Sequence, residues 1–142
     1  MDVQVATLCD SASDYNGKMC ILGTFDTICS KQVPVVHPHC ALALRVCFQP
    51  GDEGKHQFTI QFIDADGQAV MPQLQSDIVD ISLPQDAYFL TRNIVINMQR
   101  LKFDRVGLFS IDVSVDDRIL ARVPLRVMLL PEQSGNQAEG AA

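Results

Sequence analysis

Apolar and polar residues alternate with a period of two along most of the chain, and this pattern leaves little choice of fold class. In the segment 107–115 the apolar residues Phe109, Ile111, Val113 and Val115 share one side of an extended strand. The segments 56–63, 92–99 and 118–129 alternate in the same way. Successive side chains of a strand point to opposite faces, so this period predicts half-buried β-strands. No stretch has the apolar spacing and end signals of a long amphipathic helix.

The residues between these segments are those that form tight turns, which indicates an antiparallel arrangement. Asn-Gly at 16–17 and Asp-Gly at 66–67 favour tight turns, and a short polar link at 116–117 joins the last two segments. We therefore expect an all-β, antiparallel β-sandwich of about seven to nine strands. The segment 101–113 has the leucine, glycine and aromatic spacing of immunoglobulin-like domains, with Phe109 in place of their tyrosine. The expected arrangement is therefore immunoglobulin-like.

The length of 142 residues suits one domain with a hydrophobic core of its own. We expect residues 1–130 to form a single β-sandwich domain and residues 131–142, which are small and polar, to form a disordered tail. Within the domain, the segment 18–29 is apolar on both faces, which favours a strand in the centre of a sheet. Pro124 cannot donate a backbone hydrogen bond, so the last strand should lie at an edge or carry a bulge there.

The charge and the cysteines exclude several classes of protein. The chain has 17 acidic and 11 basic residues, a net charge of −6, which argues against binding to nucleic acid phosphates. Its first residues lack a secretory signal, and no apolar stretch approaches the ~18 residues that a membrane span needs. A cytoplasmic protein that contacts neither membrane nor nucleic acid is expected. Its cysteines should be free thiols, buried as small hydrophobic groups: Cys9, Cys20, Cys29, Cys40 and Cys47.

Two histidines, His37 and His39, stand before an apolar segment and raise the question of a metal site. Residues two apart on a strand point the same way, so both imidazoles could face one ion. Cys40 would then point to the opposite face, and nothing in the sequence places His56 beside the other two histidines. The ordinary start of a strand is the preferred interpretation. A metal-binding sandwich, or a metal-dependent enzyme using His37, His39 and His56, is the alternative.

Polar side chains on the outward faces of strands form a second candidate site. Asn93 and Asn97 lie on one side of the segment 92–99, and Arg45 and Arg122 are outward residues that could share a face with them. Amides and guanidinium groups held on a rigid sheet can bind a small ligand through hydrogen bonds. A solvated sandwich exterior explains the same residues, so ligand binding on this face is a further alternative.

The chain contains no recognised catalytic motif: it lacks a phosphate-binding loop, a dinucleotide-binding glycine pattern and a nucleophile elbow. We therefore expect a non-catalytic interaction module that needs no cofactor. Its partner is expected to be another protein or a second copy of the chain, because unpaired edge strands can accept a strand from a partner.

Several segments together resemble a family of small bacterial all-β proteins of unknown function. They are ATLCD (6–10), YNGK (15–18), ILGTFDTI (21–28), HPHCALALR (37–45), FIDADG (62–67), RNIVINMQRLKF (92–103) and GLFSIDV (107–113). The resemblance covers most of the chain except its last residues. It implies a compact all-β domain, and it carries no activity that could assign a role to any residue.

Overall fold

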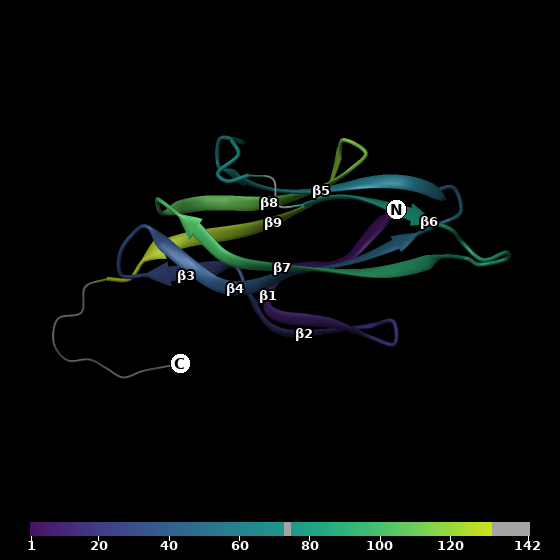
Figure 1. Ribbon diagram of the computed structural model, residues 1–142, viewed down its shortest axis with the longest axis horizontal. Coiled ribbons are helices and arrows are strands. Elements are labelled where there is room, and N and C mark those ends of the chain that lie inside the picture. The colour runs from purple at the N-terminus through teal and green to yellow at the C-terminus, as the bar shows by residue number, and fades with distance from the viewer. Residues whose placement is uncertain (73–74, 132–142) are drawn as a thin grey trace.

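A computed structural model describes residues 1–72 and 75–131 as a chain of β-strands (Figure 1). They form a four-stranded sheet in the order β2-β1-β4-β7 and a five-stranded sheet in the order β3-β9-β8-β5-β6. The predicted all-β class is confirmed, while the predicted tail lies, except for Pro131, outside the described residues. No helix in the described part is long and apolar enough to span a membrane. The strands are β1 (Asp2–Tyr15), β2 (Lys18–Phe25), β3 (Thr27–Ser30), β4 (Val35–Phe48), β5 (Gly54–Asp64), β6 (Gln75–Ile81), β7 (Leu90–Phe103), β8 (Gly107–Val115) and β9 (Arg118–Leu129).

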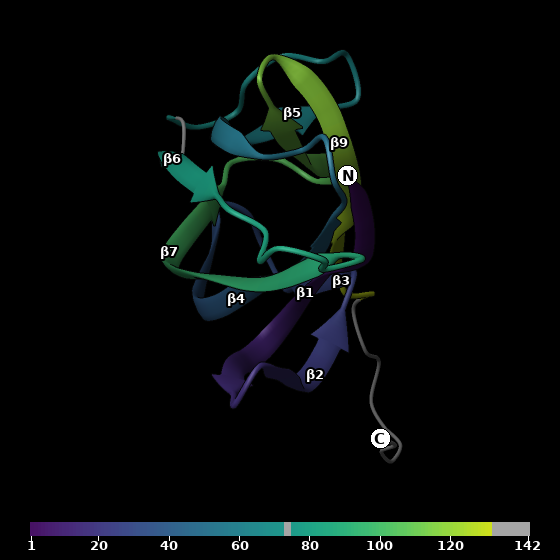
Figure 2. The same ribbon diagram turned by 90° about the vertical axis from the view of Figure 1, so that its right-hand side faces the viewer.

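The prediction of a wholly antiparallel arrangement is wrong for one strand, because β3 runs parallel to β9. Thr27 lies opposite Arg126, and Ser30 lies opposite Leu129. The chain leaves the four-stranded sheet after Phe25 and enters the other sheet at once, so β3 arrives in the same direction as β9. The five-stranded sheet also curls around the core like half of a barrel (Figure 2). The immunoglobulin-like arrangement is therefore not confirmed.

The main core lies between the two sheets and consists of the inward residues of the alternating segments. Leu42, Leu44, Phe62 and Ile111 are among its fully buried side chains. The rings of Phe62 and Phe103 meet edge to face with their centroids 5.8 Å apart. Each buried Å² of apolar surface contributes roughly 25 cal/mol, so this layer is the main source of stability.

Two of the turns predicted from the sequence are present with the expected backbone geometry. Asn16 and Gly17, between β1 and β2, have φ angles of 51° and 81°. Asp116 and Asp117, between β8 and β9, have φ angles of 50° and 68°. A positive φ at both central residues gives the two-residue turn whose twist matches that of the flanking strands.

The segment 18–29 is not one central strand, so that prediction is wrong. It is divided into β2, at the edge of the four-stranded sheet, and β3, at the edge of the five-stranded sheet. Asp26 stands between the two strands, where the chain passes from one sheet to the other. Both faces of the segment are apolar because Ile28 enters the main core, whereas Ile21 packs against a second, smaller apolar cluster.

The β1–β2 hairpin doubles back and covers the outer face of the four-stranded sheet (Figure 1). Ala41 and Ala43 of β4 alternate with the core leucines and so point to the outer face, yet both are fully buried. They form the second apolar cluster together with Cys9, and Met19 and Ile21 of the hairpin pack against it. The small alanine side chains let the hairpin approach the sheet closely.

The hairpin leaves the sheet at one position of β1. β1 pairs with β4 as far as Cys9, and beyond Cys9 its one partner among the described strands is β2. The register places Asp10 opposite Gly23 at this point. Gly23 has a φ of +70°, and a Cβ there would lie 2.5 Å from Oδ2 of Asp10. A glycine is therefore required where the hairpin bends.

Candidate functional site

The structure brings together two of the four polar residues that the sequence proposes for a binding face. Arg45 and Asn93 are direct neighbours on β4 and β7, and Nη1 of Arg45 donates to Oδ1 of Asn93 over 2.6 Å. Both side chains hold the tip of the β1–β2 hairpin. Arg45 donates to the carbonyl oxygen of Gly17 over 3.0 Å, and Nδ2 of Asn93 donates to Oδ1 of Asp14 over 2.6 Å. These hydrogen bonds fasten the hairpin to the sheet that it covers.

The other two residues lie elsewhere. Asn97 is exposed on β7 opposite Ala41. Arg122 belongs to β9 of the other sheet, where Nε and Nη2 donate to the two carboxylate oxygens of Asp112 over 3.0 and 3.4 Å. Asp112 is only 8% exposed although it is charged, and the guanidinium of Arg122 supplies its compensation. The four residues therefore do not form one common face.

The two histidines of β4 lie in different environments. His37 is half-buried with its ring against that of Phe25, at a centroid distance of 5.4 Å, whereas His39 is exposed. Before Pro38 the inward positions are Val35 and His37, two residues apart. The next inward position is Cys40, three residues after His37, so the alternation shifts by one residue at Pro38. Within residues 1–72 and 75–131, no three His, Cys, Asp or Glu side chains come together in a way that could hold a metal ion.

His56 lies in a hydrogen-bonded network that ties two loops together. Its Nδ1 lies 2.6 Å from Oδ2 of Asp116, and its Nε2 lies 2.6 Å from the carbonyl oxygen of Asp52. Both partners are acceptors, which favours the form of His56 that carries protons on both ring nitrogens, and the bond to Asp116 raises the pKa of His56. The pKa of Asp116 is lowered most by the backbone N–H of Gln57 and next by the hydrogen bond from His56. The backbone N–H of Gln49 lowers the pKa of Asp52.

Replacing His56 by glutamine is expected to cost most stability between about pH 4 and pH 6.5. The pKa of His56 is raised from 6.5, so its stabilisation is full below that value and is lost as the pH rises through the raised pKa. The pKa of Asp116 is lowered from 3.8, so its contribution is present above that value and is lost as the pH falls through the lowered pKa. Urea unfolding of both proteins across this range measures the difference, and a difference that grows above neutral pH would refute the assignment.

Three of the five cysteines are buried as the sequence predicts, and the prediction is wrong for Cys20 and Cys29. Both are exposed because they stand at outward positions of the edge strands β2 and β3. Burial raises the pKa of Cys40 to about 11 and also raises that of Cys9. The thiols of Cys9 and Cys40 therefore stay protonated at neutral pH, and a protonated thiol is a poor nucleophile.

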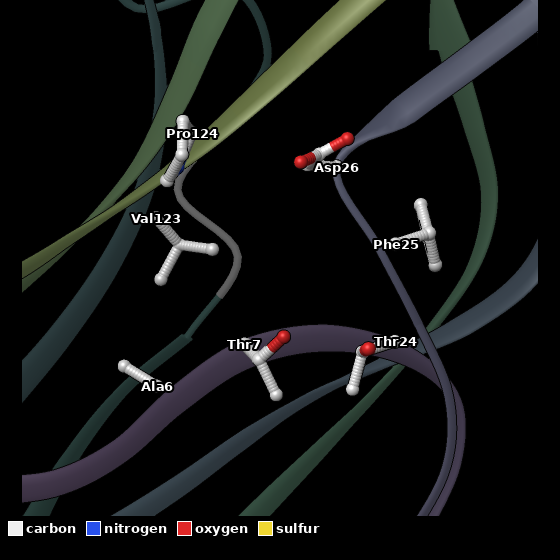
Figure 3. Close-up of a pocket in the computed structure, with 7 residues that line it drawn as sticks. All are labelled: Ala6, Thr7, Thr24, Phe25, Asp26, Val123 and Pro124. Carbon is white, nitrogen blue, oxygen red and sulfur yellow. The ribbon is translucent and has the colours of Figure 1, made fainter.

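A pocket opens along the seam where the two sheets meet without pairing. Within the part of the chain that the structure describes, residues 2–7 of β1 pair only with β4. Residues 119–125 of β9 likewise pair only with β8 there, because the pairing of β3 with β9 begins at Arg126. The pocket has a volume of about 310 Å³. Figure 3 shows Val123 and Pro124 of β9 on one side, and on the other Phe25, the last residue of β2, and Asp26, which follows it. Its lining residues are Ala6, Thr7, Thr24, Phe25, Asp26, Val123 and Pro124.

Pro124 stands at the unpaired side of β9 beside this pocket. The backbone N–H of Arg126 points away from β8 and donates to the carbonyl oxygen of Asp26 over 2.8 Å. Pro124, two residues earlier, presents its nitrogen to the same side. β9 is an inner strand of its sheet, but none of the described strands pairs with it on this side at Pro124, so the missing N–H breaks no pair among them. The proline also removes one donor with which an added strand would pair.

Next to the seam, outward side chains of three neighbouring strands form an exposed apolar surface. We define the apolar face as Cys29 of β3, Pro124 and Met128 of β9, and Leu108 of β8. Cys29 lies opposite Met128, and Leu108 is 64% exposed. A second pocket of about 430 Å³ lies beside Leu108 and shares Asp26 and Pro124 with the seam pocket. Its lining residues are Asp26, Leu108, Phe109, Pro124, Leu125 and Arg126.

One negative and one positive side chain, linked by a single hydroxyl, accompany these apolar residues. Asp26 lies beside them, and Arg126 stands among them, opposite Leu108 and between Pro124 and Met128 on the outward side of β9. The hydroxyl of Thr27 donates to Oδ1 of Asp26 over 2.8 Å. Arg126 directs Nε and Nη2 at the same hydroxyl oxygen, over 3.3 and 3.2 Å. Sequence reasoning missed this site, because its residues come from separate segments. The one local signal is Leu108, an apolar residue on the side of its strand opposite to Phe109.

A family model described as a family of unknown function (DUF6941) matches residues 4–128. No curated protein matches the chain.

Proposed function

We propose that this chain, which belongs to the family of unknown function, is a non-catalytic interaction module that binds a protein on its apolar face. The observation that carries the proposal is the grouping of exposed apolar side chains around Arg126 on three adjacent strands, with a pocket among them. Grouped apolar side chains on a surface are typical of protein interaction sites, whereas single ones are ordinary. The pocket beside Leu108 offers a place for a partner's side chain, as in the anchored centres of interfaces.

Other features favour binding through side chains over strand addition or catalysis. Pro124 lowers the number of backbone donors at the seam, which disfavours an added strand there. His56, with an acid beside it, has both ring nitrogens engaged by Asp116 and Asp52, so neither nitrogen is available to a substrate. The exposed thiols Cys20 and Cys29 suit a reducing compartment, and a cytoplasmic location is part of the proposal.

Photo-crosslinking from the apolar face tests the proposal. Leu108 is replaced by p-benzoylphenylalanine in cells that make the protein, and Ile78 is replaced in the same way as a control. Ile78 is 68% exposed on β6, outside the apolar face, and so is matched to Leu108 in exposure. We expect position 108 to form a discrete crosslink to a protein and position 78 to form none. The absence of a crosslink from position 108, or equal crosslinking from both positions, would refute the proposal.

A further inference from the structure

We infer that the protein bound on the apolar face is a second copy of this chain, joined about a twofold axis by reciprocal pairs between Asp26 and Arg126. This inference rests on the proposed interaction function and names its partner. It starts from two charges, Asp26 beside the face and Arg126 within it, which lie on either side of Thr27.

The charges select the partner. A partner surface with one positive group would be attracted by Asp26 but repelled by Arg126. An acidic surface would be attracted by Arg126 but repelled by Asp26. The face needs a surface that carries both signs in the opposite order, because wrong charge pairs across an interface cost affinity. A twofold axis supplies this order without further requirement: if Asp26 of one copy faces Arg126 of the other, then Arg126 of the first copy faces Asp26 of the second.

Both charged groups keep bonding capacity for such a partner. Oδ1 of Asp26 accepts the hydroxyl of Thr27, and the second carboxylate oxygen can accept a donor from the other copy. Arg126 uses Nε and Nη2 toward Thr27, and its Nη1 has two further N–H donors. The pairs would lie beside apolar groups that exclude water, where ion pairs are stronger than on an open surface.

The shape of the face is also self-complementary. Leu108 protrudes from β8 beside a pocket of about 430 Å³ that is lined largely by apolar groups, among them Phe109 and Leu125. About a twofold axis, Leu108 of each copy can enter the pocket of the other. The apolar contacts then provide affinity, and the two ion pairs fix the orientation.

Charge reversal with recombination of the variants is the test. The Asp26→Arg variant places arginine against Arg126 of the other copy, and the Arg126→Asp variant places aspartate against Asp26. Each variant alone therefore has two repulsive pairs in the dimer. An equimolar mixture can form a heterodimer in which both pairs are attractive again. Arg92→Asp, at an exposed arginine of β7, is the control for the same change in net charge as Arg126→Asp.

Sedimentation velocity on the purified chains measures the outcome. We expect the wild type and Arg92→Asp to form dimers as their concentration rises. Each variant at the interface should raise the dissociation constant at least tenfold, and the mixture should restore dimers. A wild type that stays monomeric at every concentration, or a mixture that stays monomeric, would overturn the inference. A monomeric wild type whose position 108 crosslinks to a different protein would overturn the inference alone, whereas no crosslink from position 108 would overturn the proposed function.

Discussion

Replacing Ala41 by glutamate is expected to lower the free energy of unfolding by about 3–5 kcal/mol, although Ala41 lies on the outer side of its sheet. Ala41 is fully buried beneath the β1–β2 hairpin, so the new carboxylate would lose its water without gaining a cation. The chain can restore hydration by releasing the hairpin from the sheet. Urea unfolding measures the loss of stability, and hydrogen exchange of residues 11–22 detects the release.

The control for this variant is its neighbour across the sheet. Asn97 lies opposite Ala41 on β7 and on the same outer side, but it is exposed. Asn97→Glu is therefore expected to change the free energy of unfolding by no more than about 0.5 kcal/mol. Equal effects of the two substitutions would show that the hairpin does not cover the outer face, which would contradict the description of the second apolar cluster.

Replacing Leu42 by alanine is expected to cost about 2–5 kcal/mol, because Leu42 is fully buried between the two sheets and truncation leaves a cavity. Leu22 provides a matched control within the same sheet. It is 70% exposed on β2, so Leu22→Ala removes the same atoms with little loss of burial. Urea midpoints of the two variants, with unchanged transition slopes, measure the difference. A cost for Leu22→Ala similar to that of Leu42→Ala would place the core elsewhere.

Strands that bury a single face could be predicted from the sequence. In β8 and β9 the apolar residues recur at every second position, and the structure buries Val113 and Val123 as this period requires. Turns that depend on neighbouring residues, such as Asn16-Gly17, could also be predicted because their geometry is local. These features needed no knowledge of contacts between distant segments.

Features that depend on distant contacts could not be predicted in this way. Ala41 and Ala43 have the spacing of ordinary outward residues, and only the doubling back of the hairpin at Asp10 and Gly23 buries them. The same bend explains why Arg45 and Asn93 fasten a hairpin tip. Alternation places these two side chains on one face, but it gives no information about the segment that lies over them.

The candidate site was missed for a related reason. Leu108 and Arg126 are partners in the β8–β9 pair, but Asp26 meets them only because β3 crosses from one sheet to the other and pairs with β9. The apolar character of the segment 18–29 on both faces indicated a central strand. In the structure this segment crosses from one sheet to the other, and its two halves pack against different apolar clusters.

The most direct test of binding through the apolar face compares two exposed thiols of the unmodified protein. Cys29 belongs to the apolar face, whereas Cys20 lies on β2 outside it, and the other three cysteines are buried. Their alkylation rates are measured by mass spectrometry in dilute and in concentrated solution. We predict that alkylation of Cys29 slows severalfold as the concentration rises, because a second copy covers it, while the rate at Cys20 stays constant. A constant rate at Cys29, or an equal decrease at both thiols, would contradict the assignment of the apolar face as the surface through which the protein binds.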